Sequence, residues 1–506
     1  MAQESAPPGL SADVAARLDR LPVTRRHRSL VITIGMGLFF DMYEIFMSGV
    51  LGPVLSDRFE LGATATSAVL ASAFVGMFLG VVTMGRLADR YGRRRFLIAS
   101  VALYTLFSAV GALSANAPML IAARFLAGIG IGPQLPLADA YLSDLLPARV
   151  RGRYTAWAYT IAFFGVPTVG LLAHWLVRLS PLGVAGWRWL FLIGTLGGVA
   201  ALLRYRRLVE SPRWLDSVGR TAEAERIVAD LEAGTPYASA KPVSVAVGPS
   251  ARLSVKAVRA RTSRRMPLVY RRRAAMMAVF HLLQSVGFYG FGTMAPLVLD
   301  AKGFSIVHSL LFSALTYFGY PLGSLISLPV IERFERKHLI VAAALAMAAF
   351  GVAFGQATDE IAIVVAGVGY TAVSNVFSNA YHVYQAEIFP TELRATATSW
   401  TYAMSRVSTA AMPFALVPVL HAFGAARLFA AVAAVMTVIA LEIGLLGPTA
   451  NGRSAYERSV EGRREEGRRA EGHLMRRRLA TRHRAKGRLA KGNPEKGRPA
   501  EGADAT

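Results

Sequence analysis

Long apolar runs separated by short polar turns are the dominant pattern of this 506-residue sequence. A helix of about 20 apolar residues spans the hydrocarbon core of a bilayer, so each run predicts a membrane-spanning helix. The runs cover residues 30–55, 65–84, 96–115, 118–142, 154–177, 187–203, 274–299, 307–330, 338–357, 361–386, 396–420 and 424–446. We therefore expect an all-α membrane protein with twelve transmembrane helices in two six-helix bundles.

Charged landmarks in the turns repeat along the chain with a constant offset of 243 residues. The repeated pairs are Asp89 and Glu332, Asp144 and Glu387, Pro147 and Pro390, and Arg151 and Arg394. One constant offset over so many residues indicates two related halves, so the two bundles should be pseudo-symmetric. A duplicated membrane half is typical of transporters.

The polar stretches divide the chain into five segments. We expect an N-terminal segment at 1–29 without a removable signal peptide, a six-helix bundle at 30–203, a linker loop at 204–273, a second bundle at 274–446 and a tail at 447–506. Within the linker, residues 215–233 predict a short amphipathic helix. The tail is rich in Gly, Arg, Glu and Ala, a composition typical of disorder.

Lys and Arg concentrate in one set of short connections, which predicts the orientation. That set contains Arg86 to Arg95, Arg149 to Arg153, Arg333 to Lys337, and Arg394, whereas the opposite set holds few basic residues. Both termini and the linker should therefore be cytoplasmic, in an inner or plasma membrane.

Composition adds two limits to this picture. The net charge of +24 comes mainly from the linker and the tail, so it predicts no nucleic-acid partner. The basic tail could contact anionic lipid or be a dispensable solvated segment. The chain has no cysteine, and we expect neither a metal site nor a cofactor, with a proton gradient as the energy source.

The first predicted helix carries two acids, Asp41 and Glu44, which share one face with Ser48. An ionisable side chain in a bilayer costs at least ~2.5 kcal/mol on insertion scales, so each requires a reason. Loss of water favours the neutral form of an acid, which suits reversible protonation. We predict proton coupling or cation binding; the alternative is a structural ion pair with another helix.

Two arginines also fall within predicted spans. Arg406 lies near the middle of the eleventh helix and could bind an anionic substrate or pair with Asp41. Arg124, in the fourth helix, is predicted to be a buried ion-pair partner that takes part in proton movement, or a purely structural one. We group Arg124 with Asp41 and Glu44 as the proton-coupling residues.

Polar stripes on the seventh and tenth helices provide further substrate candidates. Gln284 follows Asp41 by the repeat offset, so the two should lie symmetrically across a central cavity. Amides hydrogen-bond hydroxyls or carboxylates, but they can also join helices. The predicted substrate-binding residues are Arg406, Gln284, Asn375, Asn379, His281 and Tyr43.

The glycines at 128, 130 and 132 lack the preceding strand and the Lys-Ser/Thr of a nucleotide-binding loop. Small residues at this spacing let helices approach closely, so we predict helix packing there. The sequence also shows no zinc cluster and no Ser/His/Asp triad.

With these residues identified, the chain resembles the major facilitator superfamily over about residues 30–446. The turn GRLADRYGRRRFL (85–97) is similar to the signature between the second and third helices of that superfamily. More narrowly, the chain resembles the sugar-porter-like branch. The matching residues are Arg124, Gly128, Gly130, Gly132, Pro136, Tyr141, Asp144, Pro147, Arg151, Gly152, the segment Glu210 to Leu215, the segment Glu387 to Thr391, and Arg394.

The resemblance implies a cytoplasmic gate, in which acids and arginines pair across helix ends while the outside is open. The implied gate residues are Asp89, Arg90, Arg93, Asp144, Arg151, Glu210, Glu332, Arg333, Glu387 and Arg394. A few partly screened pairs, each worth about 0–1 kcal/mol, can bias two states of similar energy.

Departures from the sugar porters bear on the substrate. Hexose transporters of this branch carry paired glutamines on helix seven, whereas this chain has Gln284 alone, and their motif after the last helix is missing. The residues from Asp41 to Glu44 look more like bacterial metabolite:proton symporters and carriers of organic acids or phosphate. Phosphate carriers have an acid on helix four where this chain has Gln134, which disfavours phosphate.

We therefore predict a secondary active transporter that imports a small organic anion with protons by alternating access. We expect it to be a monomer, and we do not expect it to be an enzyme. An aromatic, sugar or carboxylic acid is the favoured substrate. The alternatives are efflux by proton antiport and a neutral sugar:proton symporter. A membrane sensor or a transferase is a remote alternative.

Overall fold

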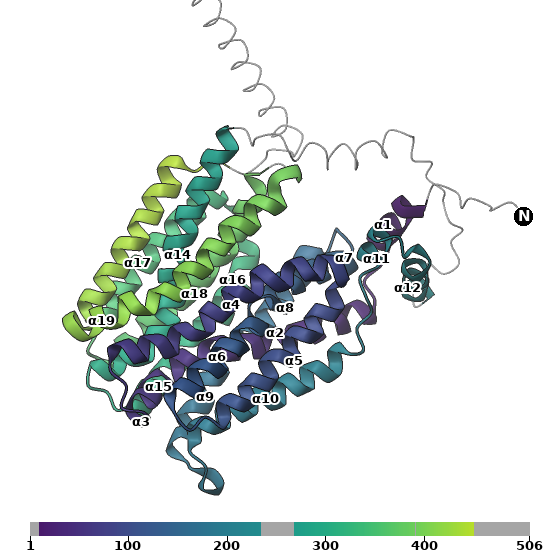
Figure 1. The fold of residues 1–506 in the computed structure, drawn as a ribbon. Helices are drawn as coiled ribbons and strands as arrows, with labels where there is room; N and C mark the ends of the chain where they lie inside the picture. The colour runs from purple at the N-terminus through teal and green to yellow at the C-terminus, as the bar shows by residue number, and fades with distance from the viewer. Residues whose placement is uncertain (1–9, 234–267, 390, 450–506) are drawn as a thin grey trace, which may run out of the picture. The chain divides into compact units, whose positions relative to one another are not determined.

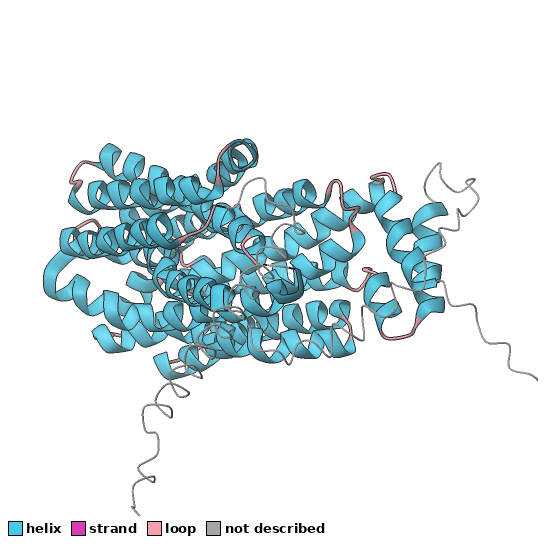
Figure 2. Cartoon of the chain, turned by 90° about the horizontal axis from the view of Figure 1, so that it is seen from above, coloured by secondary structure: helices cyan, strands magenta, loops and turns pink. Residues whose placement is uncertain are grey.

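The computed structural model describes residues 10–233, 268–389 and 391–449, and at 10–13, 15, 86, 386 and 391–402 it describes the backbone alone. Every regular element in these ranges is a helix (Figures 1 and 2). Contacts within the chain separate residues 265–271 and 452–506 as a small second unit, of which 268–271 alone are described, as the first residues of α14. The predicted tail and the second part of the predicted linker lie outside the described residues.

Residues 10–233, the described part of the first half, form twelve α-helices and one short 3-10 helix. They are α1 (Leu10–Arg20), α2 (Arg25–Val50), α3 (Gly52–Arg58), α4 (Ala63–Tyr91), α5 (Arg93–Ala112), α6 (Ala117–Ile131), α7 (Gln134–Leu145), α8 (Arg151–Phe163), α9 (Gly165–Arg178), η1 (Pro181–Gly183), α10 (Gly186–Tyr205), α11 (Pro212–Ser217) and α12 (Thr221–Ala233). The described helices of the second half are α14 (Leu268–Ala301), α15 (Ile306–Tyr317), α16 (Gly319–Arg333), α17 (Arg336–Gln356), α18 (Glu360–Glu387) and α19 (Thr391–Leu446).

Eleven described segments are long and apolar enough to cross a membrane. The last of them, Ala403–Leu446, has 44 residues. At 1.5 Å per residue it would extend ~66 Å, about twice the hydrocarbon thickness. Gly424 interrupts it with φ +77°, and the chain turns back there (Figure 1). This segment therefore supplies the last two of the twelve predicted spans.

The predicted duplication is visible in the helix boundaries. The helices α4, α5 and α6 begin at Ala63, Arg93 and Ala117, and α15, α17 and α18 begin at Ile306, Arg336 and Glu360. Each later helix begins 243 residues after its counterpart, the same offset that the charged landmarks show. The two pseudo-symmetric bundles of the predicted fold class are confirmed.

The glycine run packs helices together, as the sequence predicts. A Cβ atom added at Gly128 would lie 2.1 Å from the Ala73 carbonyl oxygen of α4, far inside van der Waals contact. Next to the run, Pro133 has no amide hydrogen to donate, and α6 ends as α7 begins. The fourth span is thus two helices in series.

A small separate core lies beside the first bundle, where α1, α11 and α12 meet. Val14 and Leu18 of α1 pack against Trp214, Leu215 and Val228. The Arg17 guanidinium also pairs with Glu232 of α12, with Nη2 2.7 Å from Oε2. The N-terminal segment is therefore joined to the first part of the linker. The predicted amphipathic helix at 215–233 is α12, which begins six residues later than expected.

Candidate functional site

Asp41 and Glu44 lie three residues apart on α2, and both are 0% exposed. A buried carboxylate without compensation is expensive in any protein interior and in a membrane above all. The surroundings of the two acids are different, and that difference defines the candidate site.

Glu44 belongs to a complete ion-pair cluster. The Arg124 guanidinium of α6 donates from Nη1 to Glu44 Oε2 at 2.7 Å, from Nη2 to the Glu44 carbonyl at 2.7 Å and from Nε to Ser48 Oγ at 2.9 Å. Ser108 of α5 donates to the remaining carboxylate oxygen at 2.5 Å. All of these side chains are buried, so this cluster joins α2, α5 and α6 with its charges balanced.

Asp41 has no such partner. Neither of its carboxylate oxygens forms a hydrogen bond with a described residue. The nearest compensation is electrostatic, from the Arg406 guanidinium of α19, with Glu44 contributing a smaller repulsion. The sequence leaves open whether Arg406 serves a substrate or Asp41, and the structure brings Asp41 and Arg406 into electrostatic range across the two halves.

Arg406 lies beside a group of aromatic rings from both halves. Its Nη1 donates to the Tyr289 hydroxyl at 3.1 Å, and its Cζ lies 5.4 Å from the centroid of the same ring. We call these rings the aromatic cluster: Phe46, Phe74, Phe163, Phe288, Tyr289 and Tyr320. Within it Phe163 of α8 stacks on Tyr320 of α16, with centroids 6.0 Å apart and ring planes at 13°.

The amide residues of the predicted site are buried and only partly satisfied. Asn375 donates to the Tyr320 carbonyl at 2.6 Å, yet its own side-chain oxygen has no hydrogen-bond partner among the described residues. The side-chain oxygen of Gln284 is in the same state. Gln134 of α7, which the sequence analysis did not assign to the site, has both amide atoms buried and unpartnered in the described part.

An unsatisfied buried polar atom costs about 1–3 kcal/mol, so each of these atoms is a candidate for a hydrogen bond to a polar ligand. Two sequence signals could have found Gln134: its position beside Pro133 at the break between α6 and α7, and its place where the phosphate carriers have an acid.

Three further predicted residues bind neighbouring helices instead. The Tyr43 hydroxyl donates to the Leu190 carbonyl of α10 at 2.9 Å, and Asn379 donates to Ser327 Oγ of α16 at 2.7 Å. His281 Nε2 contacts Gln385 Oε1 of α18 at 2.9 Å. Each contact stays within one half, so a substrate role for these residues remains a prediction that the contacts do not favour.

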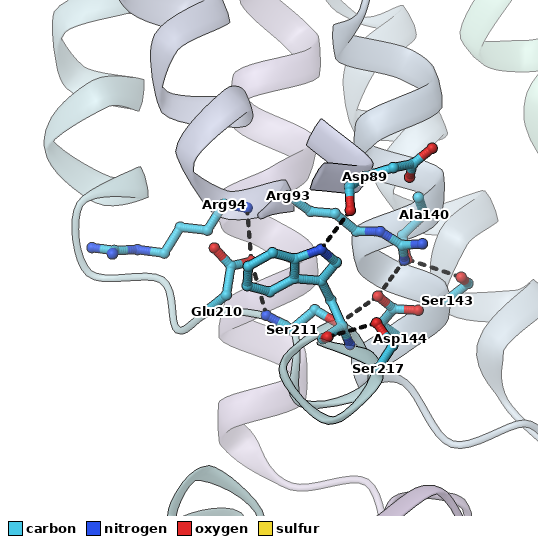
Figure 3. Close-up of polar contacts among 10 residues, drawn as sticks. Asp89, Arg93, Arg94, Ala140, Ser143, Asp144, Glu210, Ser211 and Ser217 are labelled. Carbon is cyan, nitrogen blue, oxygen red and sulfur yellow. Dashed lines mark hydrogen bonds and ion pairs between the residues drawn. The ribbon is translucent and has the colours of Figure 1, made fainter. Parts of the chain in front are cut away.

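The predicted gate residues of the first half form a network at the ends of α4, α5, α7 and α11 (Figure 3). The Arg93 guanidinium pairs with Asp144, and it also donates to the Ala140 carbonyl at 3.0 Å. Ser211 donates to Asp144 at 2.5 Å. Glu210 accepts from the backbone amides of Arg94 and Ser211, each at 3.0 Å.

Gly92 makes this arrangement possible. Its φ of +109° strongly favours glycine, and an added Cβ would lie 2.5 Å from Glu210 Oε2. The second half contains the counterpart of the Arg93–Asp144 pair: Arg336 Nε lies 3.6 Å from Glu387 Oε2. Arg336 and Glu387 follow Arg93 and Asp144 by 243 residues, so the pair itself is duplicated.

The described side chains of the other predicted gate residues do not take part in this network. Asp89 joins through its backbone carbonyl, which accepts from Trp214 Nε1 at 2.9 Å, while Arg151 reaches Asp19 at 3.6 Å. Arg90, Glu332 and Arg333 are exposed and form no ion pair with another described residue. The side chain of Arg394 lies outside the described ones.

The network includes residues that were not predicted as gate residues, Arg94, Ser211 and Trp214. The last two stand in the matched segment Glu210 to Leu215, which was the available signal.

The ion pairs Arg93–Asp144 and Arg336–Glu387 at these helix ends each lie within one half. Two further pairs, Arg151–Asp19 and Arg213–Asp19, join α8 and α11 to α1. Several contacts join the two halves, and the first two below lie toward the opposite ends of the helices. Ser67 donates to the Pro413 carbonyl at 3.1 Å, and His174 Nδ1 lies 3.0 Å from the Val307 carbonyl. Thr160 and Ser324 meet at 3.0 Å between α8 and α16.

Comparison with known proteins places this geometry in a family. The family model described as Major Facilitator Superfamily matches residues 34–413. The niacin transporter of Acinetobacter baylyi is 28% identical over 87% of this chain and 98% of its own length. The 4-hydroxybenzoate transporter of Pseudomonas aeruginosa is 27% identical over 78% of this chain and 86% of its own length.

Among solved structures, the partially occluded inward-open xylose transporter of Escherichia coli superposes with a TM-score of 0.70 at 20% identity. The match covers 85% of this chain and all of that one, and at this identity it establishes the fold. The family match supports a multi-pass membrane protein that transports a small molecule and is not an enzyme. The chain belongs to the Major Facilitator Superfamily.

Proposed function

We propose that this transporter imports a small aromatic carboxylate together with a proton. The observation that carries the proposal is the contrast on α2: Glu44 is fully paired, whereas Asp41 is fully buried with both carboxylate oxygens unpartnered among the described residues. A buried acid that lacks fixed partners can change its protonation state without dismantling the structure around it.

Charge balance links this protonation to substrate. With Asp41 ionised, its charge offsets that of Arg406, and the region is neutral overall. A carboxylate bound at Arg406 would add one negative charge in a region poor in water. Uptake of one proton by Asp41 restores neutrality, so anion and proton would cross together without net charge.

The aromatic part of the substrate is supported by the aromatic cluster and by the relatives. The Tyr289 ring lies beside Arg406, and Asn375, whose side-chain oxygen is unpartnered among the described residues, donates to the Tyr320 backbone carbonyl. Aromatic faces and edges pack favourably against a planar ring. Niacin and 4-hydroxybenzoate, the compounds for which two relatives are named, each consist of an aromatic ring with a carboxylate.

The remaining parts of the proposal concern the membrane, the orientation, the oligomeric state and the energy source. We propose an inner or plasma membrane location, with both termini and the linker cytoplasmic, and a monomer that needs no cofactor beyond the proton gradient. The duplicated pairs Arg93–Asp144 and Arg336–Glu387 would bias the equilibrium between inward-open and outward-open states.

Proteoliposomes containing the purified protein test this function. Labelled nicotinate and 4-hydroxybenzoate should accumulate when the outside is acidic, and xylose should not. Extrusion of the acids against entering protons would instead indicate an antiporter. Accumulation of xylose in their place would indicate a sugar symporter.

A further inference from the structure

A cavity of about 520 Å³, with a cluster of charged residues in its lining, lies at the charged end of the first bundle, away from Asp41. It is enclosed by the beginning of α2, the end of α7, the end of α10 with the residues that follow it, and α12. Its volume is within the range of pockets that hold drug-sized ligands. The transport mechanism proposed above does not use it.

The charges that line this cavity are predominantly positive. Arg26, Arg204 and Arg207 line it, against the single carboxylate of Asp230. No hydrogen bond or ion pair joins the guanidinium of Arg204 or Arg207 to another described residue. Two free guanidinium groups at the end of a membrane helix favour an anion, and their planar donors suit phosphate oxygens.

His27 provides an independent observation. It lines the cavity, is 2% exposed, and its Nε2 has no hydrogen-bond partner among the described residues. The Thr24 backbone amide donates to its Nδ1 at 3.2 Å. Since Nδ1 accepts, the proton of the neutral ring is on Nε2, which leaves a buried donor in need of an acceptor.

The walls of the cavity are fixed by hydrogen bonds between different elements. Arg26 donates from Nη1 to the Asp230 carbonyl, which joins α2 to α12. The Tyr141 hydroxyl donates to the Val209 carbonyl at 2.5 Å, which joins α7 to the segment after α10. The remaining lining is largely apolar and includes Leu30, Leu145, Leu208, Ile227 and Leu231.

We propose that this cavity binds a phosphate group carried on a partly apolar molecule. The phosphate contacts Arg204, Arg207 and His27 Nε2, and the apolar part lies against the leucines. Two sources have this chemistry: the headgroup of an anionic phospholipid and a soluble phosphate ester. Because the cavity is enclosed partly by α12, the bound molecule would hold α12 against the bundle.

The test uses the full-length protein in phosphatidylcholine nanodiscs, with or without phosphatidylglycerol, and with glycerol 3-phosphate or inorganic phosphate in solution. Bound lipid is counted by native mass spectrometry, and the melting temperature is followed for every probe. The variant R204Q/R207Q removes the two free charges. R206Q is the matched control, because Arg206 is also exposed and lies between them but does not line the cavity. S29W fills the cavity without changing its charge.

We expect at least one phosphate probe to bind and to raise the melting temperature of the wild type. Binding should fall roughly tenfold or more in R204Q/R207Q and in S29W, and stay unchanged in R206Q. Binding of phosphatidylglycerol alone identifies a lipid site, whereas binding of glycerol 3-phosphate identifies a soluble ester. Uptake of nicotinate by each variant reports that it is folded.

Three results overturn the proposal: no phosphate probe binds the wild type, R206Q loses as much binding as R204Q/R207Q, or S29W retains full binding. The last two indicate general attraction to surface charge. If R204Q/R207Q does not fold, S29W against R206Q decides the question.

Discussion

Two acids on one turn of α2 have opposite surroundings. Glu44 is held by Arg124 and Ser108, with both carboxylate oxygens bonded, and Asp41 is buried with both oxygens unpartnered in the described part of the chain. Burial alone therefore does not identify a titrating group in this membrane protein. What distinguishes the two acids is whether fixed donors hold the ionised form.

This difference in surroundings indicates different roles for the two acids. Protonation of Glu44 would leave the buried Arg124 charge uncompensated, so the ion pair opposes a change in the charge of Glu44. Asp41 faces the more distant Arg406, which also contacts Tyr289. We therefore assign stability to Glu44 and proton coupling to Asp41.

The largest effect is expected for Glu44→Gln. Removal of one partner of a buried ion pair costs about 3–5 kcal/mol, because the other charge stays buried. The melting temperature of the purified protein should fall sharply. Ser108→Ala, which removes one neutral donor, should cost about 1 kcal/mol. Equal melting temperatures for Glu44→Gln and wild type would remove the distinction between the two acids.

Arg406→Met should weaken binding of nicotinate. Loss of a charged hydrogen-bond partner costs about 1.5–3 kcal/mol, which corresponds to roughly tenfold to a hundredfold in the dissociation constant. Nicotinamide, which has no carboxylate, should bind wild type and variant alike. Arg427→Gln is the control, because Arg427 is an exposed cation on the same helix α19. A loss confined to nicotinamide would contradict the assignment of Arg406.

The smallest effects are expected for the duplicated pairs at the charged helix ends. Arg93→Gln and Arg336→Gln should each shift the equilibrium between the two transport states by about 0–1 kcal/mol, since both pairs are partly exposed. Arg93→Gln should shift it further, because Asp144 also holds Ser211.

The chain has no cysteine, so the substitution Asn379→Cys introduces a single thiol. The rate at which a thiol reagent labels that cysteine reports each shift of the equilibrium between the two transport states. Opposite shifts in the two variants would argue against equivalent pairs.

The sequence predicts the fold well because its signals are periodic and repeated. Apolar runs locate the spans, and the 243-residue offset anticipates the equal spacing of the helix boundaries. The pair Arg336–Glu387 follows the same offset from Arg93–Asp144, but Arg336 was not among the predicted gate residues. The sequence also anticipates Arg124 as a buried ion-pair partner. It does not say which acid Arg124 takes, because Asp41 and Glu44 share one helical face and only packing against α5 and α6 separates them.

The core formed by α1, α11 and α12 could not be predicted from the sequence either. This core brings together residues as far apart in sequence as Val14 and Val228. None of the three short helices buries enough apolar surface alone for its packing to be predicted from sequence. The positions of Gln134 and Tyr320 depend in the same way on packing between helices remote in sequence.

The most direct test of proton coupling at Asp41 is proton uptake on substrate binding. Calorimetric titration of the purified protein with nicotinate, in buffers of different ionisation enthalpy, counts the protons taken up for each anion bound. The charge balance between Asp41 and Arg406 predicts about one proton for the wild type, and none for Asp41→Asn, which still binds the anion. One proton taken up by Asp41→Asn as well would contradict this account.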